Sequence, residues 1–131
     1  MNQFSFERLE VWSESRHLAK LVYKLTGKFP DEEKFGIANQ MRRAVISVSS
    51  NIVEGSYRKS PRDKINFMNF AFSSLMELLS QVIISHDMEY ISKEEFQSLR
   101  DSIESISNKL SSLTNYFKKL ESGNRNNDIT K

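Results

Sequence analysis

A heptad-like repeat in the last third of the chain constrains the fold more than any other feature of the sequence. Apolar side chains recur there at alternating spacings of three and four, at Phe96, Leu99, Ile103, Ile106, Leu110, Leu113, Phe117 and Leu120. An α-helix places such residues on one narrow stripe, and a period of about 3.5 residues is typical of left-handed, coiled-coil-like packing. Because this stripe must be buried, the segment requires other helices as partners.

Three earlier segments have the same helical character. The chain has only four Gly and two Pro among its 131 residues, so few positions interrupt a helix. Helices are predicted over about residues 6–26, 31–58, 61–88 and 93–121. We expect one all-α domain over residues 1–121, an antiparallel up-down-up-down four-helix bundle, and a flexible polar tail over residues 122–131.

Capping residues mark the start of each predicted helix. Ser60 precedes a proline at the first position of the third helix, and Ser92 forms a capping box with Glu95 in the fourth. Ser5 is the expected cap of the first helix, with Phe4 packing on Leu9, and Asp31 that of the second.

The third predicted helix carries more apolar surface than one buried stripe requires. Its predicted core positions are Ile65, Met68, Phe72, Leu75, Leu79, Val82 and His86. Further apolar residues lie on other faces, and the candidates for an interface between copies are Phe67, Phe70, Met76 and Ile83. A monomer rarely exposes so much apolar area, so we expect a homo-oligomer. Polar residues interrupt the segment, so we expect no membrane span.

The residue types needed for common catalytic and metal sites are scarce. The chain has no cysteine and two histidines, and its formal net charge is +2. One Glu-x-x-His pair occurs, Glu14 with His17, where a di-iron bundle needs two. We therefore expect no enzyme activity, metal or cofactor. The absence of cysteine and of a signal-like N-terminal segment leads us to expect a cytoplasmic protein.

A polar stripe borders the apolar face of the second helix. It comprises Gln40, Arg43, Ser47, Ser50, Asn51 and Glu54 and spans roughly 100° of the helical wheel. One interpretation is an exposed edge. The other is a half-buried structural network in which Arg43 pairs with Glu54, Asn51 caps free donors, and Ser74 and Glu77 of the third helix are partners.

Basic residues cluster in two places that could contact phosphates. One cluster, at the turn between the second and third helices, comprises Arg58, Lys59, Arg62 and Lys64. The other is a strip on the first helix formed by Arg16, Lys20 and Lys24. The alternative for both is an ordinary solvated helix face.

Several motifs resemble a known family of four-helix bundles. They are Leu9-Glu10-Val11-Trp12, Phe29-Pro30-x-x-Glu33-x-Phe35-Gly36, Gln40-Met41-Arg42-Arg43-Ala44, Ser47-Val48-x-x-Asn51-Ile52-Val53-Glu54-Gly55, and Phe67, Ala71, Ser74-Leu75 and Glu77-Leu78. The chain resembles, over residues 6–120, the family named for proteins encoded in 23S ribosomal RNA intervening sequences, which also carries an S23 ribosomal-protein label.

This resemblance implies an up-down bundle related to the accessory protein of diversity-generating retroelements. That relative is a ring-shaped homopentamer that binds nucleic acid and a reverse transcriptase. The resemblance thus implies a non-enzymatic homo-oligomer, a pentamer, that binds RNA or DNA backbone through its basic residues. The alternative is a protein-interaction or scaffold module without nucleic-acid binding.

Overall fold

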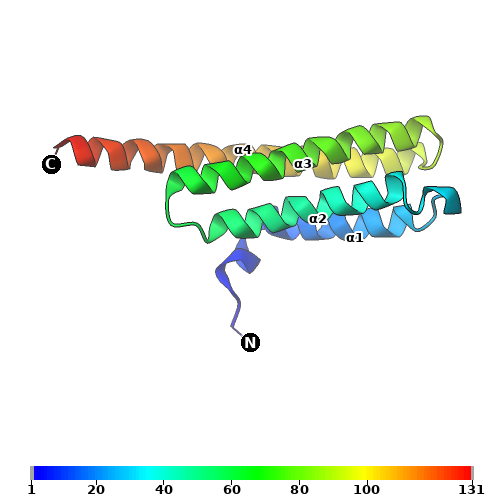
Figure 1. Ribbon diagram of the computed structural model, residues 1–131, viewed down its shortest axis with the longest axis horizontal. Helices are drawn as coiled ribbons and strands as arrows, with labels where there is room; N and C mark the ends of the chain where they lie inside the picture. The colour runs from blue at the N-terminus through cyan, green and yellow to red at the C-terminus, as the bar shows by residue number, and fades with distance from the viewer. Residues whose placement is uncertain (1, 131) are drawn as a thin grey trace.

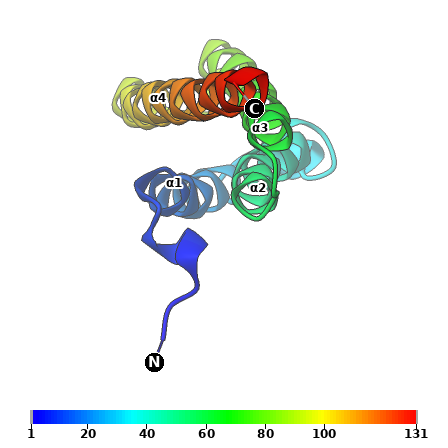
Figure 2. The same ribbon diagram turned by 90° about the vertical axis from the view of Figure 1, so that its left-hand side faces the viewer.

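The chain folds into four long antiparallel helices. The computed structural model describes the backbone of residues 2–130 and the side chains of residues 2–123. Its helices are α1 (Glu10–Thr26), α2 (Ile37–Ser56), α3 (Pro61–Asp87) and α4 (Lys93–Thr130), with short 3-10 helices at Ser5–Arg8 and Asp31–Glu33. Residues 2–130 contain no strand. Figures 1 and 2 show α2 and α3 on one side of the bundle and α1 and α4 on the other. The predicted all-α four-helix bundle is confirmed.

The core is built from one apolar stripe of each helix. In α4 the predicted repeat is buried through its middle, from Leu99 to Phe117 apart from the half-buried Leu113, and Leu120 is 39% exposed. The other helices contribute mainly aliphatic side chains, including Val11, Leu18, Val22, Met41, Val45, Val48, Ile52, Met68, Leu75, Leu78 and Val82. No ionisable side chain within residues 2–123 is fully buried, so the hydrophobic effect holds the four helices together.

The buried stripe of α3 differs from the predicted one. The buried residues are Met68, Ala71, Leu75, Leu78, Val82 and Ser85, whereas Phe72, a predicted core residue, is 38% exposed. The stripe is rotated because α3 packs most extensively against α2. Close packing of two helices favours small side chains such as Ala71 and Ser85, and it leaves the bulky Phe72 at the other edge.

Gly55 shows how closely α2 and α3 approach each other. A Cβ atom at this position would overlap the Met68 side chain and lie 2.9 Å from Phe67 Cβ. Further along the contact, Ser47 Oγ and Ser74 Oγ are 2.8 Å apart. Small residues therefore line this contact, and a larger residue at Gly55 would separate the two helices.

The starts of α1 and α2 differ from the predictions. Leu9 is extended, with φ −75° and ψ 121°, so it separates the 3-10 helix from α1, which begins at Glu10. Ser5 is consequently not the cap of α1, and Phe4 is 68% exposed. Asp31 likewise begins only a 3-10 turn, because Gly36 adopts φ −103° and ψ −123° immediately before α2.

The caps of the other two helices are confirmed. Asp63 N donates to Ser60 Oγ at 3.1 Å at the start of α3. At the start of α4, Ser92 N donates to Glu95 Oε1 at 2.8 Å, and Glu95 N donates to Ser92 Oγ at 3.1 Å. The hydrogen bond from the Ser92 backbone lowers the pKa of the Glu95 carboxyl below its ordinary value.

The ends of α2 and α4 also differ from the predictions. The structure ends α2 at Ser56, two residues before the predicted end. It continues α4 to Thr130, past the predicted end at residue 121 and through most of the predicted tail. The sequence after residue 121 contains no proline, and one glycine is a weaker helix breaker than proline. Figure 1 shows this last part of α4 extending beyond the other helices.

Helix α3 is long and apolar enough to cross a membrane by length and composition alone. Among the residues described, it is the one helix with this property, with a mean hydropathy of 1.4 over the relevant window. A helix in the interior of a bundle has the same property, and α3 packs against both α2 and α4. The bundle therefore accounts for only part of its apolar character, because 28% of that window is buried and several large apolar side chains of α3 stay exposed.

The assignment of the α4 core can be tested with two equivalent truncations. Leu110 is 1% exposed and Leu120 is 39% exposed on the same helix. Leu110→Ala should reduce the free energy of unfolding by about 2–5 kcal/mol, because it leaves a cavity. Leu120→Ala should change it by about 1 kcal/mol or less. Urea unfolding monitored by circular dichroism measures both values, and equal effects would contradict the assignment.

Candidate functional site

Most of the length of α1 and α2 is free of acidic residues, which lie only near the helix ends and in the connection between them, at Glu10, Glu14, Asp31, Glu32, Glu33 and Glu54. Residues 15–30 and 34–53, which include most of α1 and α2, contain no Asp or Glu. They contain four basic residues in the first segment and three in the second, namely Arg16, Lys20, Lys24, Lys28, Lys34, Arg42 and Arg43. Since the whole chain has a net charge of +2, the remaining residues are net negative. The α1–α2 face is thus the positive side of a nearly neutral protein.

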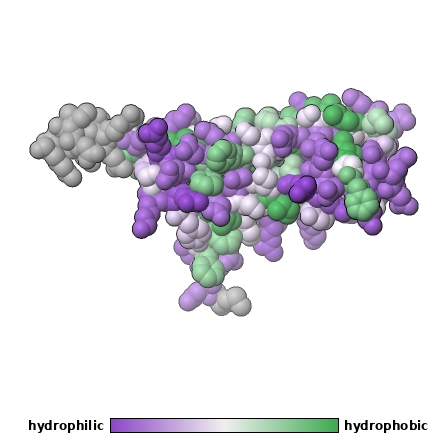
Figure 3. All heavy atoms as spheres, viewed as in Figure 1, coloured by the Kyte–Doolittle hydropathy of each residue, from purple (hydrophilic) through white to green (hydrophobic). Residues whose placement is uncertain are grey.

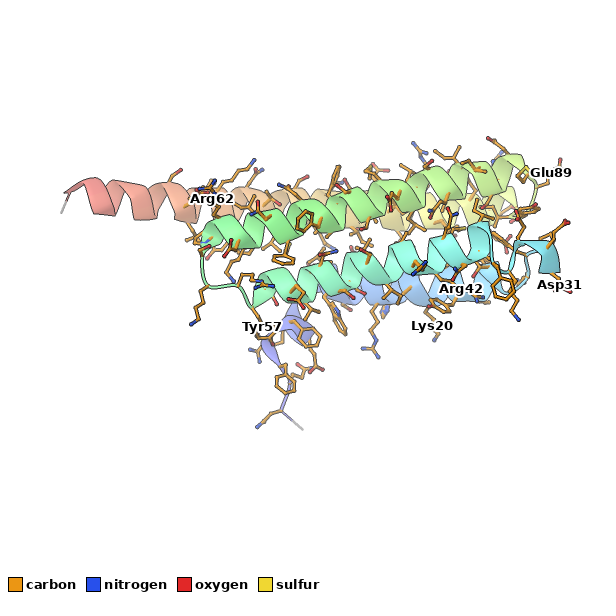
Figure 4. All side chains as sticks on the ribbon, in the orientation of Figure 1. Lys20, Asp31, Arg42, Tyr57, Arg62 and Glu89 are labelled. Carbon is orange, nitrogen blue, oxygen red and sulfur yellow. The ribbon has the colours of Figure 1, made fainter. Side chains whose placement is uncertain are left out.

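The predicted basic strip of α1 lies on this face. Arg16, Lys20 and Lys24 are all exposed. The Arg16 guanidinium lies 5.7 Å from the centre of the Trp12 ring. Lys28, further along, forms an ion pair with Glu95 at 3.8 Å. In Figure 4, Lys20 projects from α1 at nearly the same position along the bundle as Arg42 on α2.

The predicted cluster at the α2–α3 turn is partly engaged within the chain. Arg58 forms an ion pair with Glu54 at 3.1 Å, and its guanidinium lies 4.5 Å from the Phe67 ring centre. Lys64 donates to Ser56 O at 2.9 Å and thereby caps the last turn of α2. Lys59 and Arg62 are exposed. Two of the four residues thus have structural partners, unlike the exposed lysines of α1.

A shallow groove lies between α1 and α2 on the positive face. We call it the α1–α2 groove; it has a volume of about 560 Å³ and is lined by Tyr23, Asn39, Arg42, Arg43, Ile46 and Ser47. The Tyr23 side chain in this groove is 45% exposed. This groove was not predicted from the sequence. The run of residues without Asp or Glu on two successive helices is the signal that could have found it.

A second groove follows the polar stripe between α2 and α3. We call it the α2–α3 groove; it also has a volume of about 560 Å³ and is lined by Gln40, Arg43, Ala44, Ser47, Glu77, Ser80, Gln81 and Ile84. The structure thus brings together Gln40 and Arg43 with Glu77. Gln81 Oε1 is buried and has no hydrogen-bond partner within residues 2–123.

The predicted pairing of Arg43 with Glu54 is wrong. They are eleven positions apart, which is about 16 Å along the helix axis and too far for an ion pair. Glu54 instead pairs with Arg58, and Arg43 forms no ion pair within residues 2–123. A smaller network exists around Asn51, whose Nδ2 donates to Ser47 O at 2.9 Å, and Ser47 Oγ lies 2.8 Å from Ser74 Oγ.

The candidate interface residues lie on both sides of α3. Phe67 and Phe70 are beside α2 and form an edge-to-face pair with ring centres 5.7 Å apart. Met76 lies beside α4, where it lines a small pocket with Leu79 and Ile103. Phe70 is 55% exposed and Ile83 38%, whereas Phe67 and Met76 are half-buried. Figure 3 shows apolar residues, coloured green, scattered among polar ones over this side of the molecule.

The two histidines and Glu14 are not grouped as the ligands of a metal site would be. Within residues 2–123, no group of three or more His, Asp or Glu side chains could hold a metal ion. Glu14 joins α1 to α4, because it accepts hydrogen bonds from Lys109 Nζ at 2.6 Å and Ser105 Oγ at 2.9 Å. The hydrogen bond to Glu14 raises the pKa of the Lys109 ammonium. His86 stacks on Phe96, with ring centres 4.5 Å apart.

Comparisons with known proteins agree with the helical architecture. Residues 7–112 match the family model described as 23S rRNA-intervening sequence protein. No curated protein matches the chain. Among six matching solved chains is the crystal structure of a protein of unknown function from the S23 ribosomal protein family of Bacteroides thetaiotaomicron. The two are 26% identical, with a TM-score of 0.74 over 80% of this chain and 95% of that one.

Two conservative substitutions on α3 test the polar contacts described above. Ser74→Ala removes the hydrogen bond to Ser47 and should lower the free energy of unfolding by about 1 kcal/mol. Glu77→Gln should change it by about 0.5 kcal/mol or less, because Glu77 is exposed and forms no ion pair within residues 2–123. Urea unfolding at low protein concentration measures the free energy of unfolding of both variants. An equally large loss of stability for Glu77→Gln would show that the Glu77 carboxylate does have a partner.

Proposed function

The chain belongs to the family of 23S rRNA-intervening sequence proteins, and we propose that it is a non-enzymatic, homo-oligomeric accessory factor that binds RNA or DNA backbone. The observation that carries this proposal is the positively charged α1–α2 face. Lysine and arginine side chains there have no nearby carboxylates on their own helices to neutralise them. Such a surface attracts polyanions, and binding releases counterions from the phosphates.

Self-association is supported by the exposed apolar surface of α3. Four large apolar side chains of this helix are between 38% and 55% exposed, namely Phe70, Phe72, Ile83 and Ile84. They lie on two sides of α3, so one flat contact with a second copy would not cover them all. A ring uses two different surfaces of each subunit and would cover both sides. We propose a closed ring of five because the motifs resemble those of pentameric accessory proteins.

We also propose that the protein is not an enzyme. The residues common in catalytic sites are scarce, because the chain has no cysteine and its two histidines lie on different helices. His86 is occupied in a stack with Phe96. We place the protein in the cytoplasm on the same cysteine-free composition.

A protein partner, such as a reverse transcriptase, is the second candidate. The α2–α3 groove favours it, because Arg43 and Glu77 line one groove and neither forms an ion pair within residues 2–123. Opposite charges of this kind suit a polypeptide surface better than a uniformly anionic nucleic acid.

Charge reversal tests the nucleic-acid proposal. The double variant Arg16→Glu and Lys20→Glu should weaken binding of generic RNA by about tenfold or more. It should also reduce the slope of log affinity against log salt concentration by the amount expected for about two lost phosphate contacts. The matched control is Lys59→Glu with Arg62→Glu, the same charge change at the α2–α3 turn, which should have the smaller effect. A salt titration of RNA binding measures both slopes. A larger effect of the control pair would move the interface to the turn, and salt-independent binding would exclude phosphate contacts.

The mass of the protein in solution tests self-association independently of nucleic-acid binding. Sedimentation equilibrium at micromolar concentration should give a mass several times the chain mass of 15.3 kDa. Phe70→Ser and Ile84→Ser together should reduce that mass, because they place hydroxyls on the exposed apolar surface of α3. A clean monomer for the unmodified protein would exclude the ring.

A further inference from the structure

We propose that the α1–α2 groove binds an unpaired base of single-stranded nucleic acid, with Arg42 and Arg43 contacting the adjoining phosphates. This inference rests on the nucleic-acid binding proposed above and adds where the strand lies and which form of it is recognised. Three features of the groove support it: an exposed aromatic ring, an arginine fixed beside that ring, and polar groups at the groove edge.

The aromatic ring is that of Tyr23. It is 45% exposed although the Arg42 guanidinium lies only 4.9 Å from its centre. An aromatic side chain this exposed on a positively charged surface is the usual platform for stacking a base. The side chain of Ile46, 44% exposed, adds apolar surface to the same groove. Together these residues give a base an apolar contact area.

Arg42 is held in position before any ligand arrives. Its Nε donates to Thr26 Oγ1 at 2.9 Å, and that hydroxyl in turn donates to Val22 O at 2.7 Å within α1. Since Arg42 makes no other hydrogen bond within residues 2–123, its terminal N–H groups remain available to phosphate oxygens. Fixing the guanidinium in advance reduces the entropy lost on binding.

The exposed ring of Tyr23 favours single strands over duplexes. Base faces are accessible for stacking only when the base is unpaired, and a duplex presents phosphates and groove edges instead. The side chains of Asn39 and Ser47 line the groove and can hydrogen-bond to the edge of a base.

The positive residues beyond the groove indicate the path of the strand. Lys20 of α1 lies at nearly the same position along the bundle as Arg42 of α2 (Figure 4), and Arg16 lies one turn before Lys20 on α1. A strand whose base occupies the groove can therefore place its next phosphates along α1. Tyr23 would anchor the base while the lysine and arginine side chains supply the charge.

Fluorescence anisotropy with a labelled oligouridylate tests this proposal. Tyr23→Leu keeps the apolar bulk but removes the aromatic face, and it should weaken binding by about five- to hundredfold. Tyr23→Phe keeps the ring and should stay within about twofold of the unmodified protein. The matched control, Tyr116→Leu, changes a tyrosine of α4 that is 56% exposed and should have no effect. An RNA duplex should bind equally to all four proteins.

The outcomes separate the two proposals. If Tyr23→Leu binds oligouridylate as tightly as the unmodified protein, while Arg16→Glu with Lys20→Glu still weakens binding, the groove is excluded and the backbone-binding function stands. If the unmodified protein binds neither oligouridylate nor duplex, both proposals fail. An oligothymidylate measured in parallel shows by its relative affinity whether the protein prefers RNA or DNA. A loss for Tyr23→Leu with either strand supports the groove.

Discussion

The close contact between α2 and α3 determines much of the surface of this bundle. Small residues permit it: a Cβ atom at Gly55 would collide with α3, and Ser47 and Ser74 approach to 2.8 Å. Because the helices lie so near each other, α3 turns its small residues Ala71 and Ser85 inward and leaves Phe70 and Phe72 at its two edges. The same contact keeps the polar stripe of α2 at the surface. Both the apolar edges and the α2–α3 groove therefore follow from the packing of one helix pair.

Charge is distributed unevenly around this core. On the α1–α4 side, Glu14 binds Lys109 and Ser105 and joins the two helices. On the α1–α2 side, residues 15–30 and 34–53 contain basic residues but no carboxylates, and Arg42 contacts the Thr26 hydroxyl and the Tyr23 ring. Lysines and arginines that take no part in holding the helices together remain available for an anionic ligand. The net charge of +2 does not reveal this uneven distribution, because acidic residues elsewhere in the chain offset the basic residues of α1 and α2.

The sequence predicted the elements whose signals are local. The heptad repeat of α4 and the caps at Ser60 and Ser92 depend on residues within a few positions of each other, and all three match the structure. The rotation of α3 was not predictable from its own periodicity, because Phe72 and Ala71 are both apolar and only the distance to α2 selects between them. The basic residues of α1 were found from sequence. The groove beside them was missed because Tyr23 and Arg42 meet only when two helices pack.

We propose that the positively charged α1–α2 face is the functional surface. Ultraviolet crosslinking of the protein to single-stranded RNA, followed by mass spectrometry of the peptides, tests it most directly. We expect crosslinked nucleotides on peptides from Glu10–Thr26 and Ile37–Ser56, with Tyr23 among the modified residues. Crosslinks confined to α3 and α4 would contradict it.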